Sequence, residues 1–213
     1  MIIPFPTEDN FTFLLPGPVG QLEVITTKPA GAVKGVAIIC HPDPRQGGTM
    51  NNKVVTTAAR AFAAQDIATV RFNFRGIGKS SGSYGEVKGE LEDLLCIRDW
   101  IVTALPDTPL WLAGFSFGSY ISALAAQNEI LKGLISIAPP VSHYDFYALN
   151  INCPWLVIQG DQDEVVPFDQ VQSWAKQRST EICFVVMKQV THFFHGRLPE
   201  LRDHIEKWIN LVS

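Results

Sequence analysis

From about residue 35 onward, short apolar runs alternate with stretches in which apolar residues recur every three or four positions. The apolar runs are rich in Val, Ile and Phe and are bounded by Gly, Pro or Asp. Runs without polar alternation are typical of strands that are buried on both faces of a parallel sheet. We expect such strands at residues 36–40, 68–74, 110–115, 133–138, 155–159 and 182–188.

The stretches between these runs have the apolar periodicity of helices. We expect helices near residues 54–63, 87–105, 120–125, 167–175 and 198–212, with Asn51 or Asn52 capping the first. Alternation of strand and helix favours right-handed crossovers and an α/β fold with a doubly wound, mostly parallel sheet. Residues 11–15 and 22–26 flank a Pro/Gly-rich segment. They predict a hairpin that adds antiparallel strands at one edge.

Composition favours one globular domain spanning residues 1–213. Hydrophobic residues make up 46% and charged residues 18% of the chain, which argues against disorder. We find no internal repeat and no Pro/Ser-rich linker. The net charge is −4 and no basic stripe is present, so we expect no nucleic-acid partner. The apolar runs are too short to cross a membrane, and the N-terminus lacks the early Lys or Arg of a secretory signal.

The four cysteines stand apart, in apolar surroundings, at positions 40, 96, 153 and 183. None forms a C-x-x-C pair or has a His at metal-ligand spacing. We therefore expect reduced core thiols in a cytoplasmic protein. Separately, we expect no metal and no cofactor.

The strand expected at 110–115 runs into the sequence Gly114-Phe115-Ser116-Phe117-Gly118, which a helical stripe follows. G-x-S-x-G between a strand and a helix is typical of a nucleophile elbow. Gly114 and Gly118 lack side chains that would collide in so tight a turn. Ser116 would project at the helix N-terminus, where N–H groups favour developing negative charge. A Gly/Ser turn without chemistry is the alternative.

A serine nucleophile needs a base, and the base needs an acid to orient it. Acidic residues follow the strand expected at 155–159, and His192 follows the one expected at 182–188. The order Ser116, Asp163, His192 is the order of α/β-hydrolases.

Residues 35–195 resemble an α/β-hydrolase, and most closely the small bacterial lidless hydrolases or carboxylesterases. The resemblance rests on the three loops above and on segments 40–44, 47–53 and 71–80. It implies an α/β-hydrolase fold and a serine hydrolase. Its Asp-x-Val-Val-Pro pattern matches Asp163, which we favour as the acid over Asp161, Glu164 and the more distant Asp145.

We favour His192 as the base because it follows its strand directly, whereas His195 lies nearer the last helix. We expect His41 to support the loop that forms the oxyanion hole. His143 and His204 fit ordinary surface histidines.

An oxyanion hole needs two backbone N–H donors. Phe117, the residue after the nucleophile, is expected to provide one. Pro42 and Pro44 have no N–H, so Asp43 between them is the expected second donor, in agreement with the resemblance. A rigid Pro-rich turn without this role is the alternative.

The sequence Gly76-Ile77-Gly78-Lys79-Ser80 superficially resembles a phosphate-binding loop. A P-loop would need Gly where Asn73 stands, and a dinucleotide fingerprint would need Gly in place of Ser81. We therefore assign this loop a structural role.

Residues 139–153, where this superfamily commonly inserts a lid, are too few for a cap domain. Tyr144, Phe146 and Phe193 could instead form an apolar wall, although core packing explains any one of them equally well. We expect a serine carboxylesterase for short- to medium-chain esters. Thioester hydrolysis, acyl transfer and a non-catalytic binding role are the alternatives. The sequence does not fix the oligomeric state.

Overall fold

The computed structural model describes residues 3–127, 129–178 and 182–213. These residues form an eight-stranded sheet with the order β1-β2-β4-β3-β5-β6-β7-β8. The strands are β1 (Phe11–Gly17), β2 (Gly20–Thr27), β3 (Gly35–Cys40), β4 (Ile67–Phe72), β5 (Leu110–Phe115), β6 (Gly133–Ile137), β7 (Trp155–Gly160) and β8 (Ile182–Met187). Strands β3 to β8 pair in parallel, whereas β1 and β2 form an antiparallel hairpin against β4. The expected α/β fold with an antiparallel N-terminal edge is confirmed.

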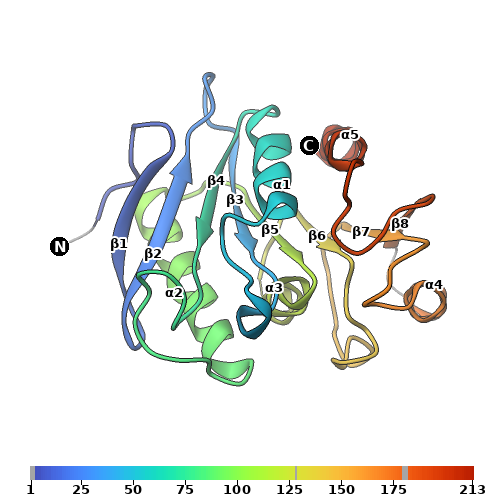
Figure 1. Cartoon of the computed structure of the whole chain (residues 1–213). Helices are drawn as coiled ribbons and strands as arrows, with labels where there is room; N and C mark the ends of the chain where they lie inside the picture. The colour runs from blue at the N-terminus through green and yellow to red at the C-terminus, as the bar shows by residue number, and fades with distance from the viewer. Residues whose placement is uncertain (1–2, 128, 179–181) are drawn as a thin grey trace.

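Helices cover both faces of the sheet (Figure 1). They are α1 (Lys53–Ala63), α2 (Lys88–Ala104), α3 (Phe117–Ala126), α4 (Phe168–Gln177) and α5 (Leu198–Val212), and a 3-10 turn, η1, spans Pro44–Gln46. Apolar residues of α1 and α5 pack together on one face, and those of α2, α3 and α4 pack on the other. None of the described helices is long and apolar enough to span a membrane.

Helix α1 illustrates how the sequence pattern produces this packing. Its buried side chains recur at helical spacing, from Val54 to Phe62, and face the sheet. The Asn52 side chain accepts a hydrogen bond from the Val54 N–H at 2.8 Å, so Asn52 is the N-cap.

The outer edge of the sheet differs from the expectation. We expected residues 182–188 to form a buried strand, but β8 is the last strand of the sheet and only Met187 in it is buried. The expectation of four core thiols is wrong for the same reason at Cys183, which lies on the exposed side of β8. Cys96 is half-buried on α2, and only Cys40 and Cys153 are buried.

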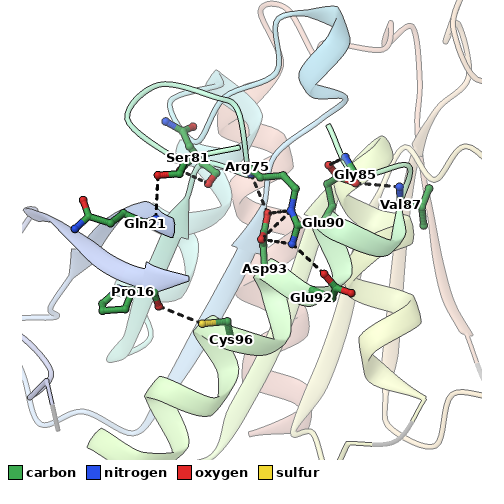
Figure 2. Close-up of polar contacts among 12 residues, drawn as sticks. Pro16, Gln21, Arg75, Ser81, Gly85, Val87, Glu90, Glu92, Asp93 and Cys96 are labelled. Atoms are coloured by element: carbon green, nitrogen blue, oxygen red, sulfur yellow. Dashed lines mark hydrogen bonds and ion pairs between the residues drawn. The ribbon is translucent and has the colours of Figure 1, made fainter. Parts of the chain in front are cut away.

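The loop that resembles a phosphate-binding motif is bound to the hairpin and to α2 instead (Figure 2). The Ser81 Oγ accepts a hydrogen bond from the Gln21 N–H at 3.0 Å, and the Ser81 N–H donates to the Gln21 carbonyl at 2.8 Å. Just before the loop, buried Arg75 pairs with Asp93 of α2 at 2.8 Å. These contacts support the structural role expected for this loop.

The direction of chain winding reverses at β3 and β5. From β3 the chain moves to β4 on one side, whereas β5 leads to β6, β7 and β8 on the other. Ligands in open α/β sheets bind at such a switch point, beyond the carboxyl ends of the strands. The loops after β3 and β5 carry Asp43 and Ser116, so the fold brings both candidate residues to this point.

Candidate active site

Ser116 connects β5 to α3 in a strained conformation. Its φ is 51° and its ψ is −122°, a backbone conformation that residues other than glycine rarely adopt. The Ser116 N–H donates to the Ile137 carbonyl at 2.9 Å, which ties the turn to β6. The Ser116 carbonyl accepts hydrogen bonds from the Ser119 N–H at 2.9 Å and the Ser119 hydroxyl at 2.6 Å. The turn is therefore fixed on both sides of the serine.

The two glycines that flank Ser116 are required by close backbone contacts. A Cβ on Gly114 would lie 2.1 Å from the Gly118 carbonyl oxygen. A Cβ on Gly118 would lie 2.4 Å from the carbonyl oxygen of Cys40, at the end of β3. These absent side chains allow α3 to begin in direct contact with the end of β3.

Asp163 and His192 form a buried pair. The Asp163 Oδ2 lies 2.8 Å from the His192 Nδ1, and their side chains are 0% and 4% exposed. With Nδ1–H donating to the carboxylate, the Nε2 of His192 remains available as a base. His192 and Ser116 line the same cavity.

No hydrogen bond joins the Ser116 hydroxyl to His192 within the described residues. Nucleophile–base hydrogen bonds commonly tighten only when substrate binds, so a loose pair is compatible with proton transfer.

The Asp163 carboxylate is held in its ionised form. Its Oδ1 accepts the N–H groups of Val165 at 2.9 Å and Val166 at 2.7 Å. Burial alone would raise the pKa of Asp163, but hydrogen bonds from His192 and these two N–H groups outweigh it and lower the pKa below its usual value.

The competing acids have separate contacts on the same loop pair. Asp161 accepts the Gln189 N–H at 2.6 Å and pairs with Lys188 at 3.3 Å. Glu164 accepts the backbone N–H of His192 at 3.1 Å. Both therefore hold the loop after β8 in place, and neither bonds the imidazole of His192.

The remaining candidates lie elsewhere. Asp145 is exposed and accepts the Ala148 N–H at 3.1 Å. His195 is exposed and stacks on Phe193, and His204 lies 3.8 Å from Glu200 on α5. His143 is exposed, but it lines the cavity instead of standing apart as an ordinary surface residue.

His41 holds the peptide unit between Pro42 and Asp43. Its Nδ1 lies 2.7 Å from the Pro42 carbonyl oxygen, and its Nε2 accepts the Phe74 N–H at 3.1 Å. These partners fix the neutral tautomer with the proton on Nδ1, and burial lowers the pKa of His41 to about 4. Because the carbonyl and N–H of a trans peptide point in opposite directions, this bond also orients the Asp43 N–H.

The Asp43 side chain anchors the same loop. Its carboxylate accepts the Arg45 N–H at 2.8 Å and pairs with the Arg45 guanidinium at 2.7 Å. That guanidinium lies 4.4 Å from the ring centroid of Tyr84. No described residue accepts a hydrogen bond from the Asp43 N–H or from the Phe117 N–H at the start of α3. Both expected donors are therefore unengaged by the protein.

A cavity of about 510 Å³ lies above Ser116, which is the size of a small-molecule site. Asp43, Phe117, Tyr144 and Phe193 line it, together with Pro42, Pro140, Val165 and Val166. The expectation that Phe146 forms part of the apolar wall is wrong. Its ring is fully buried and its centroid lies 5.3 Å from that of Trp174, whereas its neighbours Asp145 and Tyr147 are exposed.

Sequence reasoning missed two polar residues of the site. Arg45 lines the cavity. The one sequence signal for its contact with Asp43 is that it lies two residues further along the chain, after Pro44. Gln159 lies in the apolar strand β7, and its buried amide donates a hydrogen bond to Asp163 at 2.9 Å. A polar side chain in such a strand was the available signal. Within the described ranges, no group of three or more His, Cys, Asp or Glu side chains is arranged to hold a metal ion.

Comparisons with known proteins identify the family and fold of the chain. A family model described as serine aminopeptidase, S33, matches residues 31–149. The solved structure of an α/β serine hydrolase homologue from Coxiella burnetii is 51% identical, covers 95% of this chain and 99% of its own, and has a TM-score of 0.92. An α/β serine hydrolase without lid from Xanthomonas campestris is 42% identical, covers 98% and 97% of the two chains, and has a TM-score of 0.94. An uncharacterized protein of Rickettsia prowazekii is 30% identical, over 92% of this chain and 87% of its own length.

Proposed function

Because the chain belongs to the α/β-hydrolase superfamily of serine hydrolases, we propose that it cleaves short- to medium-chain carboxylic esters through an acyl-enzyme. The observation that carries this proposal is the buried Asp163–His192 pair at 2.8 Å, which borders the same cavity as Ser116 on its strained turn. The oxygen, the imidazole and the carboxylate come from three separate loops.

In the proposed first half-reaction, the Ser116 oxygen attacks the ester carbonyl carbon. His192 Nε2 accepts the hydroxyl proton, and Asp163 stabilises the resulting imidazolium. The N–H groups of Asp43 and Phe117 donate to the oxyanion, and one such donor typically contributes about 10²–10³ in kcat. Collapse of the tetrahedral intermediate breaks the ester C–O bond, and His192 gives its proton to the departing alcohol.

Water completes the cycle by the reverse sequence. His192 removes a proton from water, the hydroxide adds to the acyl carbon, and the Ser116 oxygen leaves with the proton that His192 returns. The products are one acid and one alcohol, and the enzyme is regenerated. General-base assistance of this kind is worth about 10²–10⁴ in rate.

The cavity supports the proposed ester class. Its walls include Pro140, Tyr144, Val165 and Phe193, which offer apolar contact to an acyl or alcohol group. Only a loop, from residue 138 to residue 154, separates β6 from β7. Without a cap over the serine, a ligand gains little buried area beyond the cavity itself, which favours small esters.

The same groups would also serve thioester hydrolysis or acyl transfer, because these reactions share the nucleophile and differ in the leaving group or acceptor. A non-catalytic binding role on a hydrolase fold is the remaining alternative. The cytoplasmic location expected from the cysteines likewise stays a prediction.

The proposal is tested by turnover of p-nitrophenyl esters of increasing chain length, beside acyl-CoA thioesters and an aminoacyl p-nitroanilide. We expect hydrolysis of the short and medium esters, and its loss in Ser116→Ala with the circular dichroism spectrum unchanged. A folded Ser116→Ala protein that retains the activity would refute the assignment. Faster turnover of the thioester or the anilide than of the esters would show that the proposed substrate class is wrong.

A further inference from the structure

Gln159 is a buried amide in an otherwise apolar strand. Strand β7 has the sequence Trp-Leu-Val-Ile-Gln-Gly, and every residue in it is buried. The Gln159 side chain is 0% exposed, and its Nε2 donates to the Asp163 Oδ2 at 2.9 Å and to the Val166 carbonyl at 3.3 Å.

The other end of this amide has no partner. Gln159 Oε1 is buried and accepts no hydrogen bond within the described residues. A buried acceptor without a donor destabilises a fold, and an apolar side chain of the same size would avoid that cost. Packing in the core therefore does not explain an amide at this position, whereas its hydrogen bonds do, and the shortest of them is the one to Asp163.

That contact falls on the oxygen that faces the imidazole. Asp163 Oδ2 accepts from both Gln159 Nε2 and His192 Nδ1, while Oδ1 accepts the two backbone N–H groups described above. Without Gln159, His192 would be the one side chain that fixes Oδ2, and the carboxylate would be freer to turn. We infer that Gln159 is a positioning residue that holds the Asp163 carboxylate in the plane that His192 requires, an inference that rests on the function proposed above.

Gln159 does not border the cavity, so it would act through Asp163 and not on the substrate. Its loss should therefore change kcat and leave KM unchanged. A hydrogen bond to a charged group is strong enough for a loss of about 10- to 100-fold.

The test compares Gln159→Met, which keeps the size and removes the donor, with Gln162→Met on the same loop, whose side chain is exposed. We expect kcat for a p-nitrophenyl ester to fall about 10- to 100-fold in Q159M, with KM unchanged, and no change in Q162M. A Q159M enzyme with wild-type kcat would overturn the inference. If Q159M does not fold, Gln159→Leu also removes the donor without adding a charge and carries the same comparison.

A double-mutant cycle separates positioning from general packing. If Gln159 acts through Asp163, then adding Gln159→Met to Asp163→Asn should cause no further loss of kcat. Losses that add fully would show that Gln159 acts elsewhere and would contradict the inference.

A second readout does not depend on turnover. The low-field proton NMR resonance of His192 Nδ1–H should move in Q159M and stay in place in Q162M. A wild-type protein that hydrolyses no ester would refute the proposed function, whereas an unmoved resonance in Q159M would refute the positioning role.

Discussion

Ser116 holds backbone strain at the candidate active site. At φ 51° its backbone lies in a region that costs about 1–3 kcal/mol for a residue with a Cβ. The surrounding hydrogen bonds hold it there, and the residue borders the cavity. A glycine at this position would have no Cβ to strain.

We therefore expect Ser116→Gly to be more stable than Ser116→Ala, although both lack the nucleophile. The relief of strain exceeds the entropic cost of glycine by about 1 kcal/mol. Urea unfolding of the two variants measures this difference. Equal stabilities would mean that the turn is not strained in solution.

His41 predicts a pH dependence of stability. Its pKa falls from 6.5 in the unfolded chain to about 4 in the fold, because burial disfavours its charged form. Between these values the unfolded state binds more protons, so stability decreases as the pH is lowered from 6.5 to 4, by about 3 kcal/mol in all.

Denaturant unfolding at several pH values tests this, with His41→Gln as the comparison. We expect the wild type to lose more stability than H41Q over that pH window. Parallel curves for the two proteins would show that His41 is not buried in its neutral form.

At the scale of elements, the first turn of helix α3 is in close backbone contact with the end of β3. A methyl group on Gly118 would meet two backbone carbonyl oxygens, of Cys40 at 2.4 Å and His41 at 2.5 Å. Because the Cys40 oxygen belongs to β3 and His41 follows it directly, α3 would have to move, and the Phe117 N–H would move with it.

We expect Gly118→Ala to destabilise the protein by about 1–3 kcal/mol and to reduce ester turnover. Gly196→Ala is the control, because Gly196 does not border the cavity, a Cβ there meets no atom within 4 Å, and only its φ of 72° is unfavourable. Thermal unfolding and ester assays check both variants. A Gly118→Ala variant with the stability and ester turnover of the wild type would contradict the close contact between α3 and β3.

Helix α2 is joined to the loop after β4 by the buried Arg75–Asp93 pair of Figure 2. Asp93→Ala removes the buried carboxylate that pairs with Arg75 and leaves only the more exposed Glu92, so we expect a loss of about 3–5 kcal/mol. Glu92 also contacts Arg75, at 3.2 Å, but its side chain is 44% exposed. Chemical denaturation should therefore show a loss within about 1 kcal/mol for Glu92→Ala. Similar losses for the two variants would contradict the account.

For the whole molecule, the sequence predicts the fold well because the buried strands are continuous apolar runs, whereas the helices between them repeat apolar residues every three or four positions. The strand at Leu110–Phe115 was predicted to the residue. The edge position of β8 was not, because an apolar run does not reveal whether another strand pairs beyond it. The core position of Phe146 was missed for a similar reason, since an aromatic residue in a loop carries no sign of the direction it faces.

The candidate site was predicted in order but not in detail. Ser116, Asp163 and His192 can be picked out from their positions in the sequence, because each follows a predicted strand. The contacts of Gln159, Glu164 and Arg45 depend on tertiary geometry that no local pattern encodes.

The most direct measurement is intact-mass analysis after reaction with a fluorophosphonate, followed by peptide mapping. We expect a single adduct on the Ser116 oxygen, absent in Ser116→Ala and formed much more slowly in His192→Ala. No adduct under conditions that label a control serine hydrolase, or an adduct on a different residue, would contradict the account.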